Sequence, residues 1–424
     1  MRRIPPVIAI LSLFLITTAS SQVTAIKAGK LIDPKNGAVL TGQTILIDGK
    51  RIKAVGSGLS IPRDAAVIDL SRYTVLPGLI DGHTHILLQP EDEGEIPPII
   101  TKSQAFRTVQ GVAAARAELE AGFTMLRDVD SEGAGFADIA IRDAINKGII
   151  PGPRLLVAGD CLTITGGHMN LVGINPDIQV PDPGLLIDSR DAMIAAVRRN
   201  VKYGVDFIKI YATGRASQND PVTLEPLTTF SLEEIKTVVE EAKRFRKDVS
   251  SHAYGGQGAK NSILAGVRSI EHGMLLDDET LKLMVERGTY WCPTLCVYIP
   301  EDEKVEVNDM IKRIIPRHKD TFQRAMKMGV KIAFGTDVGA YTHGHSAREF
   351  VKMVEYGMKP IDAIRSATLT TSELVRMEKE IGTIEPGKYA DIIATEGNPV
   401  DDIKALTRVV FVMKEGKVYK GVKE

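Results

Sequence analysis

Cysteine is scarce in this chain of 424 residues, which has only Cys161, Cys292 and Cys296. A small and odd number of cysteines does not fit a disulfide framework, even in an exported protein. Cys292 and Cys296 lie in the strand-like stretch YWCPTLCV, where packing in a core is the simpler interpretation. A metal site built from cysteines is therefore the weaker hypothesis, and we expect any metal ligands to be other residues.

An excess of one charge is lacking as well, since the formal net charge is −1 and no long basic run occurs. The charge pattern therefore favours neither a nucleic acid nor an anionic membrane surface as a partner. Beyond the N-terminus, no stretch is apolar over the roughly 20 residues that a membrane-spanning helix needs. We expect no membrane span in the mature chain.

The N-terminus differs from the rest of the sequence. MRRIPPVIAILSLFLITTASSQ begins with two arginines, continues with an apolar run over residues 7–17 and ends with small residues. This layout is typical of a secretory signal peptide, whereas a membrane anchor would need a longer apolar run. We predict a signal peptide over residues 1–21 and a protein exported to the periplasm or secreted.

The middle of the chain alternates short apolar runs with amphipathic stretches such as SQAFRTVQGVAAARAELEAG and SLEEIKTVVEEAKRFRK. Eight strand–helix units over about 300 residues predict an α/β fold of the (β/α)8 TIM-barrel type. A doubly wound open sheet is the alternative, but its glycine-rich phosphate turn is missing. The eight runs are TVLPGLIDGHTH, FTMLRDV, RLLVAGD, DFIKIYAT, VSSHAYG, SIEHG, TYWCPTL and KIAFGTD.

Both ends of the mature chain are rich in short β runs with turns between them. We therefore predict that the two ends build one small β-sandwich domain around the barrel. The predicted boundaries are residues 22–74 and 381–424 for the two parts of the sandwich and residues 75–380 for the barrel.

Active sites of such barrels lie at the C-terminal ends of the strands, and this is where polar residues interrupt the apolar runs. In a strand, His83 and His85 share one face because side chains alternate. Two such histidines alone are equally consistent with a core position. Further polar residues at the strand ends make a metal site the stronger hypothesis, and they are Lys209, His252, His272 and Asp337.

Lys209 lies in the apolar strand VDFIKIYATG, where an unpaired ammonium is expensive to bury. It could pair with a carboxylate, act as a Schiff-base lysine, or carry a carboxyl group derived from CO2. We favour the third alternative, because a carbamate can bridge two divalent metal ions. Imidazole and carboxylate ligands suit zinc and related ions, and six ligands favour two metal ions about 3.5–4 Å apart.

Several longer stretches resemble the amidohydrolase superfamily, in the branch with metal-dependent Xaa-Pro dipeptidase-like enzymes. They cover most of the mature chain: PGLIDGHTH, AGFTMLRD, FIKIYATG, SHAYGGQGAKNSILAGVRSIEHG, GTDVGAYTHGHSAREF and IGTIEPGKYADIIATEGNP. The resemblance implies two divalent metal ions, Lys209 as N6-carboxylysine, and Asp337 as both ligand and general base. The ligands it implies are His83, His85, Lys209, His252, His272 and Asp337.

The resemblance also implies an activity, namely hydrolysis of an amide bond next to a C-terminal carboxylate in dipeptides or N-acyl amino acids. Some relatives hydrolyse ochratoxin A, an amide of phenylalanine, and the chain is similar to that subset. Relatives often form homo-oligomers, so we expect one here. The alternatives are a cyclic-amide hydrolase resembling imidazolonepropionase, which Lys209 argues against, and an inactive barrel that serves as a binding or scaffold protein.

Four further residues are candidates for substrate binding. His168 lies in the glycine-rich stretch CLTITGGHMN, and Tyr254 shares a strand face with His252, from which it could stabilise an oxyanion as a second catalytic residue. Arg215 could bind a substrate carboxylate, although a solvated loop position is equally consistent. In YTHGHSAREF we assign His343 to the substrate mouth. His318, in the charged stretch IKRIIPRHKD, is predicted to lie at the surface.

Overall fold

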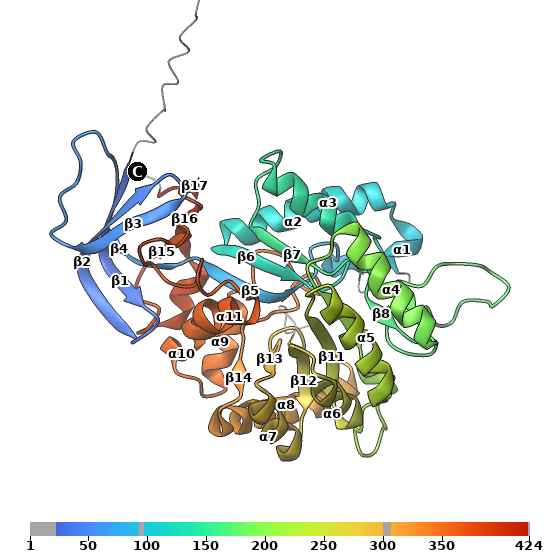
Figure 1. Ribbon diagram of the computed structural model, residues 1–424. Coiled ribbons are helices and arrows are strands. Elements are labelled where there is room, and N and C mark those ends of the chain that lie inside the picture. The colour runs from blue at the N-terminus through green and yellow to red at the C-terminus, as the bar shows by residue number, and fades with distance from the viewer. Residues whose placement is uncertain (1–22, 93–96, 300–306, 423–424) are drawn as a thin grey trace, which may run out of the picture.

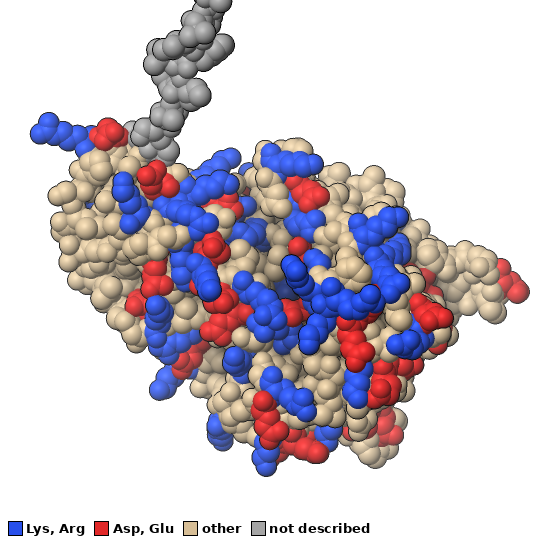
Figure 2. Space-filling model, viewed as in Figure 1, with Lys and Arg blue, Asp and Glu red and all other residues tan. Residues whose placement is uncertain are grey.

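The computed structural model describes residues 23–92, 97–299 and 307–422. The predicted signal peptide lies outside the described residues. Among the residues that are described, no helix combines the length and apolar character that crossing a bilayer requires. On the face shown in Figure 2, basic and acidic side chains are interspersed.

Eight parallel strands form a closed barrel surrounded by helices (Figure 1). Backbone hydrogen bonds join the two hydrogen-bonded groups of barrel strands, from Gly82 N to Phe334 O at 2.8 Å and from Asp206 N to Val157 O at 2.8 Å. A strand lies in each of the eight apolar runs, so the predicted TIM barrel is confirmed. The barrel strands are β5 (Leu79–Thr84), β6 (Phe123–Asp128), β7 (Arg154–Val157), β10 (Ile208–Tyr211), β11 (Val249–Gly255), β12 (Ser269–Leu275), β13 (Tyr290–Cys292) and β14 (Lys331–Ile332).

Helices follow every barrel strand and bury their apolar stripes against it. The long ones are α2 (Gln104–Glu120), α3 (Ala137–Asn146), α4 (Arg190–Tyr203), α5 (Leu232–Arg244), α6 (Gly256–Ala265), α7 (Asp278–Arg287), α8 (Asp309–Met328) and α9 (Arg348–Glu355). Short helices are α1 (Pro98–Thr101), α10 (Pro360–Arg365) and α11 (Thr371–Leu374), and two short strands, β8 (Leu162–Thr163) and β9 (Leu185–Leu186), extend the sheet beside β10.

The two ends of the chain form one mixed, seven-stranded sheet beside the barrel (Figure 1). Its order is β17-β16-β15-β4-β1-β2-β3, so the last strands of the chain extend the sheet begun by the first. The prediction that both ends build one β-rich unit is confirmed, whereas its sandwich form and the domain boundaries stay predictions. The strands are β1 (Thr24–Asp33), β2 (Ala38–Asp48), β3 (Arg51–Ser57), β4 (Ala66–Pro77), β15 (Ile392–Thr395), β16 (Val409–Lys414) and β17 (Lys417–Lys420).

The first predicted barrel strand is divided between the two sheets. The run TVLPGLIDGHTH contains the end of β4, which pairs with β15, and all of β5, which pairs with β6. Gly78 stands at the junction, where a Cβ atom would lie only 2.2 Å from Oγ1 of Thr124. Only glycine fits this close approach. β4 ends at Pro77 and β5 begins at Leu79, so Gly78 alone separates the two sheets.

Candidate metal and active site

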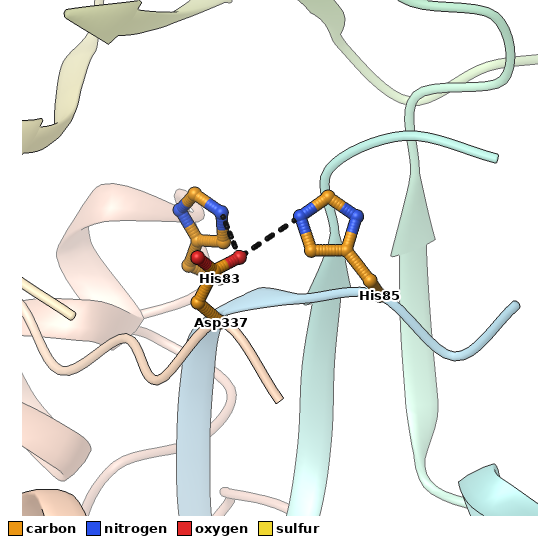
Figure 3. A group of neighbouring side chains, drawn as sticks. All are labelled: His83, His85 and Asp337. Carbon is orange, nitrogen blue, oxygen red and sulfur yellow. Dashed lines mark ion pairs between the residues drawn. The ribbon is translucent and has the colours of Figure 1, made fainter. Parts of the chain in front are cut away.

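His83 and His85 converge on one carboxylate at the C-terminal end of the barrel (Figure 3). Nε2 of His83 lies 3.2 Å and Nε2 of His85 lies 3.1 Å from Oδ1 of Asp337, which follows β14. Both imidazoles are almost fully buried. The ligand atoms of the three residues lie within 4.8 Å of one another, close enough to hold one metal ion.

His272 and Asp337 have strained backbones. Their φ angles are +69° and +62°, a left-handed conformation that side chains other than glycine rarely adopt. Such strain costs of order 1–3 kcal/mol and is concentrated at functional sites. Both side chains lie beside His83: its ring centroid is 4.9 Å from that of His272, and its Nε2 is 3.2 Å from Oδ1 of Asp337.

Lys209 and His252 lie on adjacent strands beside these residues. The Lys209 side chain is fully buried, and within the described part of the chain neither its Nζ nor Nε2 of His252 has a hydrogen-bond partner. The ring of His252 lies 4.5 Å from that of His272. Buried polar atoms without partners are costly, so this donor set fits a bound cation better than an apolar core.

The electrostatics of the site favour an ionised Asp337, neutral His252 and His272, and a protonated His85. Burial would raise the pKa of Asp337, but the imidazoles of His83, His85 and His272 outweigh burial and hold this pKa well below its usual range. Burial lowers the pKa of His252 and His272, and Lys209 lowers both further. For His85, burial is outweighed by Asp337, Glu132 and Asp130, which raise its pKa to about 10.

Three carboxylates near the histidines were missed in the sequence. Oε2 of Glu271 lies 2.8 Å from Nδ1 of His83, and Oε1 of Glu132 lies 3.1 Å from Nδ1 of His85. Asp130 accepts a hydrogen bond of 2.5 Å from the hydroxyl of Tyr211. Their signal was present in the runs RDVDSEG and SIEHG, where acidic residues directly follow or interrupt a buried strand.

Burial would raise the pKa of Glu271, but the charge of Arg127 and the hydrogen bond from His83 hold it well below its usual range. Glu271 is therefore a charged carboxylate inside the barrel.

A cavity of about 670 Å³ opens above these residues, and His85, His252, His272 and Asp337 form its floor. Its wall is largely apolar. The apolar residues of the wall include Leu88, Pro97, Met169, Leu171, Val172, Val297, Met310 and Ile311.

Three of the four predicted substrate contacts line this cavity: His168, Tyr254 and Arg215. Nδ1 of His168 accepts a hydrogen bond of 2.9 Å from the backbone N–H of Met169, and burial, Arg215 and Lys209 lower its pKa to about 3. The ring is thus neutral, with its proton on Nε2. Arg215 donates to the backbone oxygen of Asn170 at 2.9 Å, which holds its guanidinium at the wall.

The fourth predicted contact is placed elsewhere. Among the described residues His343 is not part of the cavity wall, because its Nε2 meets the backbone oxygen of Leu88 at 3.0 Å and its Nδ1 lies 3.6 Å from Glu118. Tyr298, which sequence reasoning missed, does line the cavity, with its hydroxyl 3.0 Å from Nδ1 of His272.

The prediction that His318 lies at the surface is wrong. It is 2% exposed and packs against Trp291 and Tyr298. Its neighbours in sequence are charged, but on α8 it shares the buried stripe of Ile314 and Phe322, at spacings of four residues.

Comparisons with known proteins agree with this geometry. The model of the Amidohydrolase family matches residues 74–423. Ochratoxinase from Aspergillus niger is 31% identical over 438 residues, covering 96% of this chain and 89% of that protein. Its crystal structure superposes with a TM-score of 0.81 at 29% identity, covering 95% of this chain and 96% of that one.

A crystal structure of a Xaa-Pro dipeptidase with bound methionine in the active site superposes with a TM-score of 0.85 at 38% identity, covering 94% of this chain and 100% of that one. The family match spans the barrel and the C-terminal strands of the end sheet, and the structural matches extend over almost the whole chain. The chain therefore belongs to the amidohydrolase family, whose members are hydrolases acting on C–N bonds.

Proposed function

We propose that this protein is a metal-dependent amidohydrolase that cleaves the amide bond next to a free C-terminal carboxylate, in dipeptides or N-acyl amino acids. The observation that carries the proposal is the convergence of His83 and His85 on Asp337 in the floor of a cavity with a guanidinium in its wall.

The residues present fit a pair of divalent cations, with zinc as our proposal for their identity. His83, His85, His252, His272, Asp337 and a carboxylated Lys209 would hold them. Lys209 and His252 carry the buried polar atoms that need a partner. A divalent cation in such a site acts as a Lewis acid and lowers the pKa of water.

The protein's own groups complete the reaction. Asp337 is ionised and faces the cavity, so it can accept the proton of the attacking water and pass it to the leaving amine. Nε2–H of His168 and the hydroxyl of Tyr254 can donate hydrogen bonds to the carbonyl oxygen as its negative charge develops. The apolar wall excludes water and suits a substrate with apolar side groups.

Arg215 is the residue that we propose binds the carboxylate of the substrate. A guanidinium binds a carboxylate with two parallel hydrogen bonds, and the backbone of Asn170 already fixes one of its nitrogens. Relatives named for ochratoxin and for Xaa-Pro dipeptides both act on an amide next to a carboxylate. We therefore propose ochratoxin A and dipeptides with an apolar C-terminal residue as substrates.

The test combines metal content per chain with hydrolysis of a panel of Xaa-Pro, Xaa-Met and Xaa-Phe dipeptides, N-acetyl amino acids and ochratoxin A. We expect two metal ions per chain and cleavage of substrates with a free carboxylate. Arg215→Gln should raise KM for these substrates but not for their C-terminal amides, which lack the charge.

Cleavage of a cyclic amide alone, with one metal ion, would favour the imidazolonepropionase-like alternative. A folded protein without metal or activity would favour a scaffold.

Export and homo-oligomer assembly stay proposals drawn from the sequence. Sequencing the N-terminus of the mature protein and measuring its mass in solution by light scattering would test them.

A further inference from the structure

We propose that Glu271 is a positioning residue, which holds His83 with the proton on Nδ1 so that Nε2 presents its lone pair to the metal. The inference rests on the proposed function, in which His83 is a metal ligand.

The two oxygens of Glu271 have different partners. Oε1 accepts hydrogen bonds from Arg127 at 2.7 Å, Ser250 at 2.6 Å and Ser269 at 2.5 Å. Oε2 faces Nδ1 of His83 at 2.8 Å, and both side chains are 0% exposed. An ionised carboxylate can only accept, so the shared proton belongs to Nδ1 of the imidazole, and Nε2 is the ring atom that can present a lone pair to a metal ion.

Arg127 stabilises the hydrogen bond between Glu271 and His83 in two ways. Its guanidinium neutralises Glu271 inside the barrel, so the carboxylate can stay charged without water. Its Nε also donates at 2.6 Å to the backbone oxygen of Gly82, the residue before His83. The side chain of His83 and the backbone leading to it are thus tied to one network, which joins β5 and β6 to β11 and β12 on the opposite side of the barrel.

The other histidines show what is particular to His83. Nδ1 of His85 also meets a carboxylate, but that of Glu132, which lines the cavity. Nδ1 of His272 meets the hydroxyls of Thr294 and Tyr298. His83 therefore combines a charged partner with complete burial, and a partner of this kind orients a metal-binding imidazole and raises its basicity.

A purely structural role would be that Glu271 neutralises Arg127 and leaves His83 unaffected. Glu271→Gln separates the two roles. Arg127, Ser250 and Ser269 would donate hydrogen bonds to the oxygen of the new amide. The NH2 group of the amide must then face Nδ1 of His83 and donate to it. A proton of His83 is then held on Nε2 instead, where a metal ion must displace it in order to bind.

The first measurement is made on metal-free protein labelled with 15N-histidine, with the His83 signals assigned from a His83→Asn variant. We expect Nδ1 of His83 to carry a proton in the wild type and to be unprotonated in Glu271→Gln, whatever the protonation of Nε2, which faces Asp337. The second measurement is zinc affinity by competition with a chelator, which should fall by about 10–100-fold. Glu132→Gln is the matched control and should alter the signals of His85 but not those of His83.

If Glu271→Gln fails to fold, two other variants carry the test. Glu271→Gln with Arg127→Met removes both buried charges, and Glu271→Asp keeps the charge but withdraws it from His83. Each should weaken zinc binding in a protein whose circular dichroism is unchanged.

Unchanged protonation of Nδ1 and wild-type zinc affinity in any folded variant would overturn the inference. A wild-type protein that binds no zinc would instead refute the proposed function, while the protonation of Nδ1 in metal-free His83 would still report on Glu271.

Discussion

Lys209 is the residue whose substitution tests the metal site most directly, because its ammonium is fully buried in the barrel. Lys209→Ala should lose bound metal and hydrolytic activity together, since it removes the carboxylated lysine that we propose as the bridging group. Short carboxylic acids such as propionate should restore part of both by occupying the vacated space. The measurements are metal content per chain and kcat, with Lys236→Ala, at a partly exposed lysine of α5, as control. Full activity in Lys209→Ala would contradict a bridging role.

Tyr254 tests the stabilisation of charge on the substrate. Tyr254→Phe should keep the full metal content but lower kcat by about 10²–10³-fold, the effect of losing one oxyanion donor. Tyr341→Phe is a suitable control, because that hydroxyl is buried against Sγ of Cys296. Loss of metal from Tyr254→Phe would show that its role is structural.

Glu349 should give the stability of the protein a pH dependence. Burial raises its pKa from 4.5 to about 7, although the backbone N–H groups of Leu295 and Cys296 oppose the shift. Between these two pH values the folded state binds a proton that the unfolded state has released, so stability falls as pH rises.

Relative to Glu349→Gln, the wild type should lose about 3 kcal/mol of unfolding free energy between pH 4.5 and pH 8. Urea unfolding at several pH values measures this. Glu355 is exposed on the same helix, and Glu355→Gln should leave the pH dependence of the unfolding free energy unchanged. If the difference in unfolding free energy between wild type and Glu349→Gln did not vary with pH, the raised pKa of Glu349 would be refuted.

At the residue scale, the sequence predicted the histidines and Asp337 because polar residues stand out at the ends of apolar runs. It did not reveal Glu271, whose partners Arg127 and Ser250 come from distant strands. The sequence also did not predict where the ring of His343 points, because the residues around a loop histidine do not determine the direction of its side chain.

At the scale of elements, the strands of the barrel were predictable because each is buried on both faces and reads as a short apolar run. The division of the first run at Gly78 was not, because it depends on the close approach of Thr124. The short strands β8 and β9 were missed for a similar reason, since they depend on pairing beside β10 rather than on their own composition.

The start of α5 gives a test at this scale. Ser231 and Glu234 form a capping box, in which Oε2 of Glu234 accepts from the backbone N–H of Ser231 at 2.8 Å and the Ser231 hydroxyl accepts from the backbone N–H of Glu234. Ser231→Ala should lower the free energy of unfolding by about 1 kcal/mol in urea titrations, with kcat unchanged. Ser231→Thr keeps the acceptor and should retain wild-type stability; equal losses in both would rule out the cap as the cause.

At the scale of the whole molecule, Arg154 joins the barrel to the end sheet. From β7 it pairs with Asp391 at 2.9 Å and Glu415 at 2.8 Å, both in the C-terminal part of the chain. Arg154→Met should lower the free energy of unfolding by about 3 kcal/mol, because two largely buried carboxylates lose their partner.

Chemical unfolding followed by circular dichroism measures this loss. Arg116→Met breaks an exposed pair with Glu120 and should cost less than about 0.5 kcal/mol. Similar values for the two variants would mean that Arg154 contributes no more than a surface pair.

The pairing of β4 with β15 also has a consequence for biosynthesis. Pro77 pairs with Ile392, so the strand that leads into the candidate metal ligands His83 and His85 lacks this neighbour until about 315 further residues have been translated. At about 5–20 residues per second this delay lasts about 15–60 s. Throughout that time the nascent chain presents an unpaired strand edge, the feature most prone to aggregation. A strand that is translated after the whole barrel therefore completes the sheet from which the first barrel strand emerges.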